Sequence, residues 1–427
     1  MFIAGANSPI KNTDYRVVLP FYAYAALAFL VATVLMMADV GAFTQHHFNA
    51  KALAITHTMA LGWGTMMILG ASHQLFPVLI EGKLHSNTLA YLSFIFGAIG
   101  IPMLVYAFYT FNFGLVAQAG AIAVNLAVIS YLVNLTISIV QTKKHNVHAV
   151  SAFTAVIWLL VTTLVGLLLV YNFQTPIFTQ ASIHYLSLHA HLGIIGWFLL
   201  MIIGVGARLI PMFLISKYEN QKTLWWIYWL VNGGLISFII IFIYGGNFLI
   251  TLIPVALIGA AVILFGRFIY KAYQKRIRKK VDEQVQTSML SVALIGVPLV
   301  IIIGVILIFS TLGNQQFVTL YGFTIFFGWI TAIILGMTFK TLPFIVWNKV
   351  YHDIAGLGKT PNPKELFKNN IFIANIISYL LGFVILSFGI INSNIIALNI
   401  GAGLLLLNAL LYNINVFTIL FHQSKIK

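Results

Sequence analysis

The chain has 427 residues, of which 61% are hydrophobic and only 7% charged, with a formal net charge of +15 and a mean hydropathy of +0.99. A water-soluble domain carries about 25% charged residues, so this composition excludes one, and it also excludes a disordered chain. The apolar runs are continuous instead of alternating, which excludes an outer-membrane β-barrel. The chain has no cysteine, so disulfides, thiolate metal sites and iron–sulfur clusters are excluded as well. What remains is an all-α polytopic membrane protein in contact with lipid.

Twelve apolar segments are long enough to cross a bilayer, which takes about 20 residues each. We expect these transmembrane helices at residues 15–38, 51–79, 88–109, 115–140, 149–171, 182–215, 224–243, 247–270, 287–311, 317–347, 369–389 and 394–421. The longest polar connection, residues 348–368, is too short to bury a core of its own. The sequence therefore predicts a single integral membrane domain over residues 1–427.

Positive charge is distributed unevenly among the connections. The connections after the even-numbered helices and both chain ends carry the Lys and Arg residues, whereas Lys51 is the only cation expected near the opposite side. By the positive-inside rule, both termini are expected in the cytoplasm and the membrane is expected to be a bacterial-type inner (plasma) membrane. The basic run RFIYKAYQKRIRKK at residues 267–280 is read as a cytoplasmic retention signal beside anionic lipid, with no nucleic-acid partner.

Three of the segments share an internal repeat. They read HTMALGWGTMMILGASHQLFP from His57, HLGIIGWFLLMIIGVGARLIP from His191 and FTIFFGWITAIILGMTFKTLP from Phe323. Gly-Trp, a second Gly and a Pro recur at the same offsets in all three: Gly62, Trp63, Gly70 and Pro77; Gly196, Trp197, Gly204 and Pro211; Gly328, Trp329, Gly336 and Pro343. The spacing predicts three four-helix repeat units, at about 15–140, 149–270 and 287–421, around a pseudo-threefold axis.

The repeated Gly and Pro are explained by close helix packing and by helix kinks or ends. Eleven residues after each Trp the repeat places a polar residue, Gln74, Arg208 or Lys340. Because these positions are expected near the cytoplasmic ends of the helices, we interpret them as side chains that snorkel to the membrane surface.

The 12 histidines outnumber the 8 carboxylates, and a few of them fall inside the membrane. His57 and His191 occupy the same repeat position, roughly 12 Å below the outer helix end, where an ionisable residue indicates a functional site. His189 projects about 200° away from His191 on the same helix, so the two face different grooves. His184 lies one heptad above His191 on the same face, roughly 10 Å away, which suits an entrance or supporting group.

Imidazole at this depth, without Cys or an intramembrane carboxylate, favours a haem iron held between helices over zinc or non-haem iron. We therefore expect His57, His191 and His189 to bind haem iron, the alternative being hydrogen-bonded core histidines. His73 is a weaker candidate. The remaining histidines are expected to be solvated in loops or at helix ends: His46, His47, His85, His145, His148, His352 and His422. Lys51, His184, His46 and His47 are candidate partners for haem propionates.

The segment His189-Ala-His191-Leu-Gly193-Ile-Ile-Gly196-Trp197, ending at Pro211, resembles the His-x-His helix of the haem–copper oxidase catalytic subunit. The cbb-type cytochrome c oxidases and the nitric oxide reductases are the most similar members, and the NnrS family of haem- and copper-containing membrane proteins is more loosely similar. The resemblance implies twelve helices in three arcs, with His191 on a low-spin haem b and His57 as its other axial ligand. It also implies that His189 faces a second haem or a small gas such as O₂ or NO.

The chain departs from that family in three respects. The His-x-His pair lies on the sixth helix instead of the tenth, and the seventh helix lacks the His-His pair that the family's copper site needs, which puts copper in doubt. Intramembrane carboxylates are also missing, which argues against proton pumping.

We therefore expect one or two haems b serving electron transfer or O₂/NO chemistry, with a cytochrome or quinol as electron donor. No catalytic residue can be assigned, and whether the chain is an enzyme, an oxidoreductase of this type, is left open. The alternatives are a transporter or channel, or a non-catalytic haem sensor, on the same scaffold.

Overall fold

The computed structural model describes residues 13–142, 146–307, 315–355 and 360–424. Twelve helices in this part of the chain are long and apolar enough to cross a membrane. The prediction of an all-α, multi-pass membrane protein is therefore confirmed, and most of the helix bounds differ from the expected ones by only a few residues. The largest difference is in the tenth span, which runs from Gln315 to Ile354, past its expected end at residue 347.

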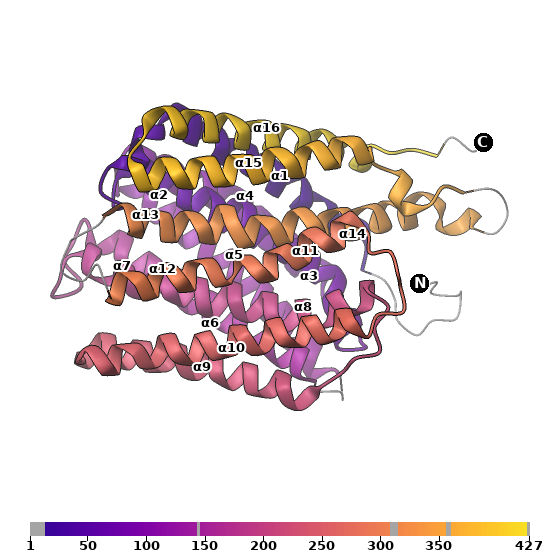
Figure 1. Ribbon diagram of the computed structural model, residues 1–427, viewed down its shortest axis with the longest axis horizontal. Helices are drawn as coiled ribbons and strands as arrows, with labels where there is room; N and C mark the ends of the chain where they lie inside the picture. The colour runs from indigo at the N-terminus through magenta and orange to yellow at the C-terminus, as the bar shows by residue number, and fades with distance from the viewer. Residues whose placement is uncertain (1–12, 143–145, 308–314, 356–359, 425–427) are drawn as a thin grey trace. The chain divides into compact units, whose positions relative to one another are not determined.

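The helices follow the order seen in Figure 1. Their bounds are α1 (Tyr15–Ala38), η1 (Val40–Thr44), α2 (Ala50–His57), η2 (Thr58–Thr65), α3 (Met66–Leu79), α4 (Asn87–Tyr109), α5 (Leu115–Val140), α6 (Val147–Asn172), η3 (Ser182–Tyr185), α7 (Leu186–His191), η4 (Leu192–Leu199), α8 (Leu200–Phe213), α9 (Gln221–Tyr244), α10 (Phe248–Gln274), α11 (Glu283–Leu294), α12 (Gly296–Leu307), α13 (Gln315–Phe323), η5 (Thr324–Ile330), α14 (Thr331–Tyr351), η6 (His352–Ile354), η7 (Pro363–Glu365), α15 (Asn369–Asn392) and α16 (Ile395–Leu420).

Asparagine side chains fix the start of several helices. The residue just before α2, α6, α9, α10 and α16 is an Asn whose side-chain oxygen accepts a hydrogen bond from a backbone N–H in the first turn. Each bond satisfies one of the donors that a helix start leaves unpaired, so the polar residue between two apolar runs sets the boundary. The tight turn after α9 uses Gly245, whose φ of +77° disfavours a residue with a side chain.

The chain divides into two compact units. Unit 1 comprises Met1–Asp14, Ser72–Ala107 and Asn112–Val281, and unit 2 comprises Tyr15–Ala71, Phe108–Phe111 and Asp282–Lys427. These boundaries do not follow those of the three predicted repeat units, whose arrangement around an axis stays a prediction.

In unit 1, α6 packs against several of the other helices. It lies beside α5 on one side and beside η4 and α8 on another, while α9 and α10 form an antiparallel hairpin (Figure 1). Close approach depends on glycine: a Cβ on Gly204 of α8 would lie 2.7 Å from the Cβ of Ser151 on α6, and a Cβ on Gly234 of α9 would lie 2.7 Å from Ile258 on α10. Small residues thus replace hydrophobic burial as the means by which helices pack in lipid.

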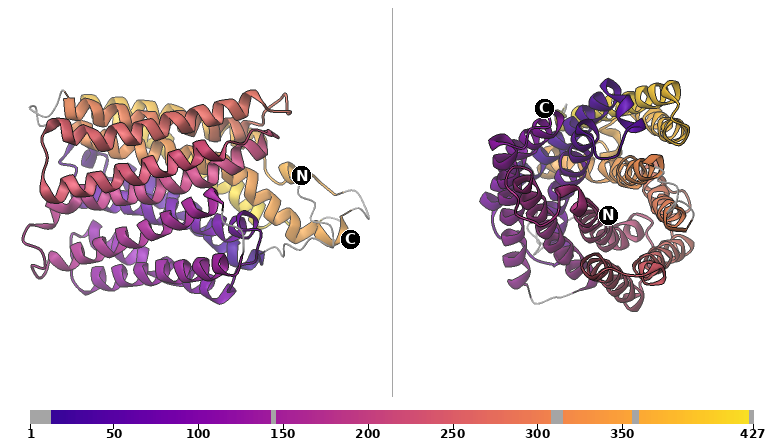
Figure 2. Two further views of the ribbon diagram at one scale, coloured as in Figure 1. Left: turned by 90° about the horizontal axis from the view of Figure 1, so that it is seen from below. Right: turned by 90° about the vertical axis from the view of Figure 1, so that its left-hand side faces the viewer.

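In unit 2, the pair α15 and α16 lies side by side in the end-on view of Figure 2, and α1 packs against α16 and η2. The helix α11 lies along α14. The repeated glycines again mark the contacts, since a Cβ on Gly70 would lie 2.5 Å from Phe21 of α1 and one on Gly336 would lie 2.6 Å from the Gln284 backbone oxygen of α11.

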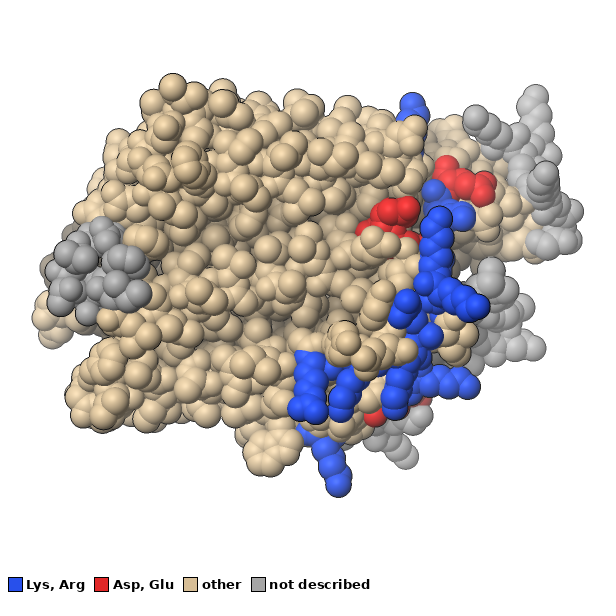
Figure 3. Space-filling view, in the orientation of Figure 1, with Lys and Arg blue, Asp and Glu red and all other residues tan. Residues whose placement is uncertain are grey.

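Lys and Arg side chains gather where helices end, and the helix sides visible in Figure 3 carry none. We call this end of each unit its basic end. In unit 1 it includes the last turn of α10, with Lys271, and in unit 2 it includes the last turn of α14, with Lys349. The uncharged helix sides are suited to lipid.

Candidate functional site

Each of the three repeated segments widens from α-helix to π-helix directly after its first residue. The π segment η2 begins after His57, η4 after His191 and η5 after Phe323. All three contain the Gly-Trp pair, and their Trp side chains are almost fully buried. Because π-helical turns are rare and concentrate at functional sites, their recurrence next to two membrane histidines identifies a candidate site.

His57 lies in unit 2, at the end of α2. Its Nδ1 is 2.8 Å from the carbonyl oxygen of Leu53, one turn earlier in the helix. The ring of Phe108 lies beside the imidazole, with centroids 4.3 Å apart and planes inclined by 38°. The side chain is only partly exposed.

His191 lies in unit 1, at the end of α7, and has the same local geometry. Its Nδ1 is 2.7 Å from the carbonyl oxygen of Ser187, again four residues earlier. Phe238 of α9 supplies the neighbouring ring, with centroids 4.9 Å apart and an angle of 46° between the planes. The two histidines at equivalent repeat positions therefore each make the same kind of backbone hydrogen bond, and each has a phenylalanine ring beside it.

The backbone bond decides which ring nitrogen can bind a ligand. A carbonyl oxygen only accepts hydrogen bonds, so Nδ1 of His57 and of His191 carries the proton. In a neutral imidazole the lone pair then belongs to Nε2. This orientation is the usual one for histidines that bind a metal through Nε2 and fix the ring through the other nitrogen.

The third repeat position is filled by aromatic rings. Phe323 stacks on Phe327 and Phe383 at centroid distances of 5.3 and 5.6 Å, and Phe43 meets it edge-on at 6.3 Å. The position therefore has neither a metal ligand nor an open face toward these neighbours.

His189 and His184 project in different directions. His189 faces α6, where a Cβ on Gly166 would lie 2.9 Å from its Cε1. His184 lies in η3 and is exposed, and its ring is 5.4 Å from that of Phe242 on α9. Phe242 is one turn from the Phe238 that contacts His191, so His184 and His191 both lie on the side that faces α9.

His57 lies in unit 2 and His191 in unit 1, and that the two share one iron stays a prediction. Among the residues whose positions are described, no three His, Asp or Glu side chains form a group that could hold a metal ion.

At the end of unit 2 opposite its basic end, side chains from α2, from the end of α4 and from the turn between α1 and η1 interact. The Lys51 ammonium lies 3.0 Å from the centroid of the Tyr109 ring, and the Tyr109 hydroxyl donates to Asp39 at 3.0 Å. The rings of His46 and His47 lie 4.2 Å apart in the adjoining turn. Burial, and then the neighbouring His46, lower the pKa of His47 below its usual value.

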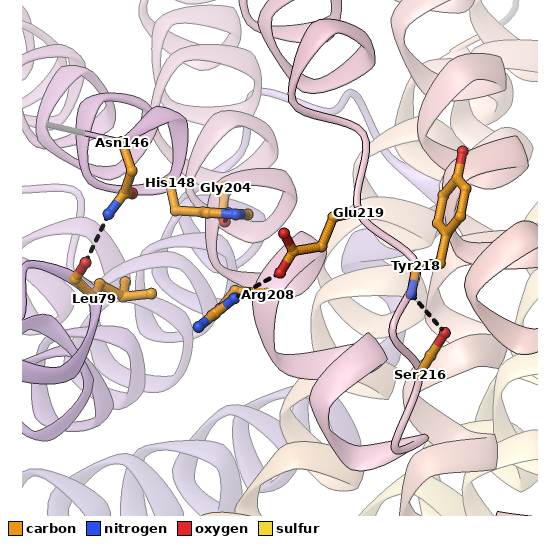
Figure 4. Close-up of polar contacts among 8 residues, drawn as sticks. All are labelled: Leu79, Asn146, His148, Gly204, Arg208, Ser216, Tyr218 and Glu219. Carbon is orange, nitrogen blue, oxygen red and sulfur yellow. Dashed lines mark hydrogen bonds and ion pairs between the residues drawn. The ribbon is translucent and has the colours of Figure 1, made fainter. Parts of the chain in front are cut away.

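His148 is buried, which corrects the expectation of a solvated side chain. It is 7% exposed and its Nδ1 is 2.8 Å from the carbonyl oxygen of Gly204 (Figure 4). The cause is helix packing: Asn146 caps α6 and donates to the Leu79 carbonyl at 2.8 Å, which places the first turn of α6 against neighbouring helices. His73, at 1% exposure, is also buried, with its ring 5.1 Å from that of Tyr131.

The other histidines expected in solvent differ among themselves. His46, His85 and His352 are exposed, His47 and His422 are partly buried, and His145 lies outside the described residues. His422 is bound through Nε2 to the Tyr351 hydroxyl at 2.9 Å.

At two of the three repeats the polar position forms an ion pair, which snorkelling to the membrane surface does not require. Arg208 bonds to Glu219 at 3.4 Å, and this pair is mostly exposed (Figure 4). Lys340 pairs with Asp282, and these two side chains are only 15% and 25% exposed. No spacing rule in the sequence links Lys340 to an acid 58 residues earlier, so only the fold reveals the pair.

No protein-family model matches the chain, and no curated protein matches it either.

Proposed function

We propose that the chain is a haem b-binding membrane protein in which His57 and His191 are axial ligands of haem iron. The observation that carries the proposal is the shared geometry of these two side chains. At equivalent repeat positions, each donates Nδ1–H to the carbonyl four residues earlier and keeps Nε2 for a metal.

The donor chemistry fits haem. Helices that present single imidazoles and flanking aromatic rings suit a flat macrocycle with one or two nitrogen ligands. Phe108 beside His57 and Phe238 beside His191 supply the apolar rings that would pack on such a group. Zinc sites, in contrast, draw on three or four protein ligands held close together.

A bound haem would supply one-electron transfer or a site for O₂ or NO. The protein's own part is to hold two imidazoles in one tautomer, to exclude water with aromatic side chains and to present His189 toward a second groove. Lys51, held over the Tyr109 ring, is the candidate cation for the propionates. A cytochrome or a quinol is the proposed electron donor, and copper is not part of the proposal.

The proposal also covers the orientation of the protein in the membrane and the arrangement of its helices. The basic ends of the units face the cytoplasm of a bacterial-type inner membrane, together with both termini, because Lys and Arg are retained on that side. Three four-helix repeats surround a pseudo-threefold axis, which is supported by the π segment and buried Trp that recur in each one.

Optical spectroscopy of the purified protein, with pyridine haemochrome and metal analysis, tests the proposal. The expected result is a Soret band and one or two haems b per chain. A colourless protein without iron would refute it and would favour the transporter reading. Consumption of NO or O₂ under turnover then separates a gas-reacting enzyme from an electron-transfer or sensor protein, which would titrate with reductant without consuming gas.

A further inference from the structure

The helix α6 and the span formed by α7, η4 and α8 run antiparallel and meet through glycines. Along this contact the glycine belongs to the η4–α8 side and the larger residue to α6: Gly204 faces Ser151, Gly196 faces Trp158 and Gly193 faces Thr162. The three glycines therefore allow the span to approach α6 closely.

One turn beyond Gly193, the glycine and the larger residue exchange helices. Here the span carries the large residue, His189, and α6 carries the glycine, Gly166. A Cβ on Gly166 would lie 2.9 Å from Cε1 of His189, 3.6 Å from its Nδ1 and 3.7 Å from its Nε2. The imidazole thus points its Cε1 edge at the α6 backbone, with the two nitrogens at nearly equal distances.

We propose that Gly166 is a positioning residue for His189: the missing side chain on α6 sets the tilt of the His189 imidazole, and hence the direction in which its nitrogens can bind a ligand. This inference rests on the proposed role of His189 beside a haem.

The geometry predicts a specific effect of adding one methyl group. A contact of 2.9 Å lies below any that real Cβ atoms make, so the ring has to move until the distance approaches the 3.4 Å of ordinary contact. The imidazole is the distal part of a side chain with two torsions, so a change of these torsions can move the ring without moving the helices. Gly166→Ala should therefore tilt His189 and leave the fold intact.

Four variants of the full-length protein test the inference: Gly166→Ala, His189→Ala, their double variant, and Gly259→Ala as the matched control. Gly259 lies in α10 of the same unit, and a Cβ there would meet nothing within 4 Å. Each variant is purified and examined by thermal unfolding, by the spectrum of the reduced haem and by carbon monoxide binding.

Gly166→Ala is expected to lower the unfolding midpoint by about 1–3 °C when His189 is present and not in the His189→Ala background. It should also shift the reduced haem bands or the fraction of haem that binds carbon monoxide, whereas Gly259→Ala should change neither. Combining it with His189→Ala should give the spectrum of His189→Ala alone, because Gly166 acts through that ring.

The outcomes separate the inference from the proposed function. A wild-type protein without haem overturns the proposed function, and the positioning role falls with it. A wild-type protein with haem whose spectrum and carbon monoxide binding are the same in Gly166→Ala and Gly259→Ala overturns the positioning role alone. Additive effects of Gly166→Ala and His189→Ala on stability or spectrum also contradict it.

Discussion

Replacing Lys340 by Met should destabilise the protein more than the same replacement of Arg208. The two residues occupy the same repeat position and each is paired with a carboxylate, but Lys340 and Asp282 are 15% and 25% exposed whereas Arg208 and Glu219 are 53% and 68% exposed. The two ion pairs therefore differ in burial, while Lys340 and Arg208 have the same position in the repeat.

The magnitude follows from what each substitution leaves behind. Removing one partner of a fully buried pair costs about 3–5 kcal/mol, because a charge stays buried without compensation. An exposed pair contributes about 0–1 kcal/mol. For the mostly buried Asp282 we expect Lys340→Met to lower the free energy of unfolding by about 2 kcal/mol, and we expect Arg208→Met to lower it by less than about 1 kcal/mol.

Reversible unfolding in increasing mole fractions of sodium dodecyl sulfate, followed by tryptophan fluorescence, measures both values. Asp282→Asn combined with Lys340→Met should recover much of the loss, since no lone charge remains. Equal losses for Lys340→Met and Arg208→Met, or no recovery in the double variant, would refute the reasoning from burial.

Three further predictions follow from packing and charge. Gly336→Ala should lower the free energy of unfolding by about 1–3 kcal/mol because its Cβ would overlap α11, whereas Gly403→Ala, with open space around it, should be neutral or slightly stabilising; unfolding in sodium dodecyl sulfate measures both. Because the folded pKa of His47 is lowered, the unfolded chain binds a proton first as the pH falls below about 6.5, so stability should drop in that window and drop less in His47→Gln; thermal unfolding at pH 8 and pH 5.5 decides. Phe323→His should leave the haem content of the purified protein unchanged, because aromatic rings fill that position; an additional haem by pyridine haemochrome would contradict the packing argument.

Hydropathy predicts the helices well because a bilayer imposes length and apolarity on each span. The expected segment 115–140 coincides with α5, and 15–38 coincides with α1. Hydropathy misplaces the end of a helix that extends beyond its apolar run, as α10 does when it continues through Lys271 to Gln274. Charge alone does not end a helix, so the pattern misplaces such boundaries.

The candidate site is only partly visible in the sequence. The repeat identifies His57 and His191 as equivalent, but their bonds to Leu53 and Ser187 depend on side-chain rotation and appear only in the structure. The burial of His148 is likewise a tertiary effect, since its place two residues after a helix cap is compatible with either solvent or a neighbouring helix. The only sequence feature common to the three π segments is the Gly-Trp pair, which begins five residues after His57, His191 and Phe323.

His57 and His191 are the residues that we propose bind haem iron. The most direct test compares the reduced-minus-oxidised spectrum and the haem content of the wild type with those of His57→Ala and His191→Ala, using the exposed His352→Ala as the control. We predict that each of the first two variants loses or strongly shifts the haem bands, while His352→Ala keeps them unchanged. Wild-type bands and haem content in both His57→Ala and His191→Ala would contradict the account.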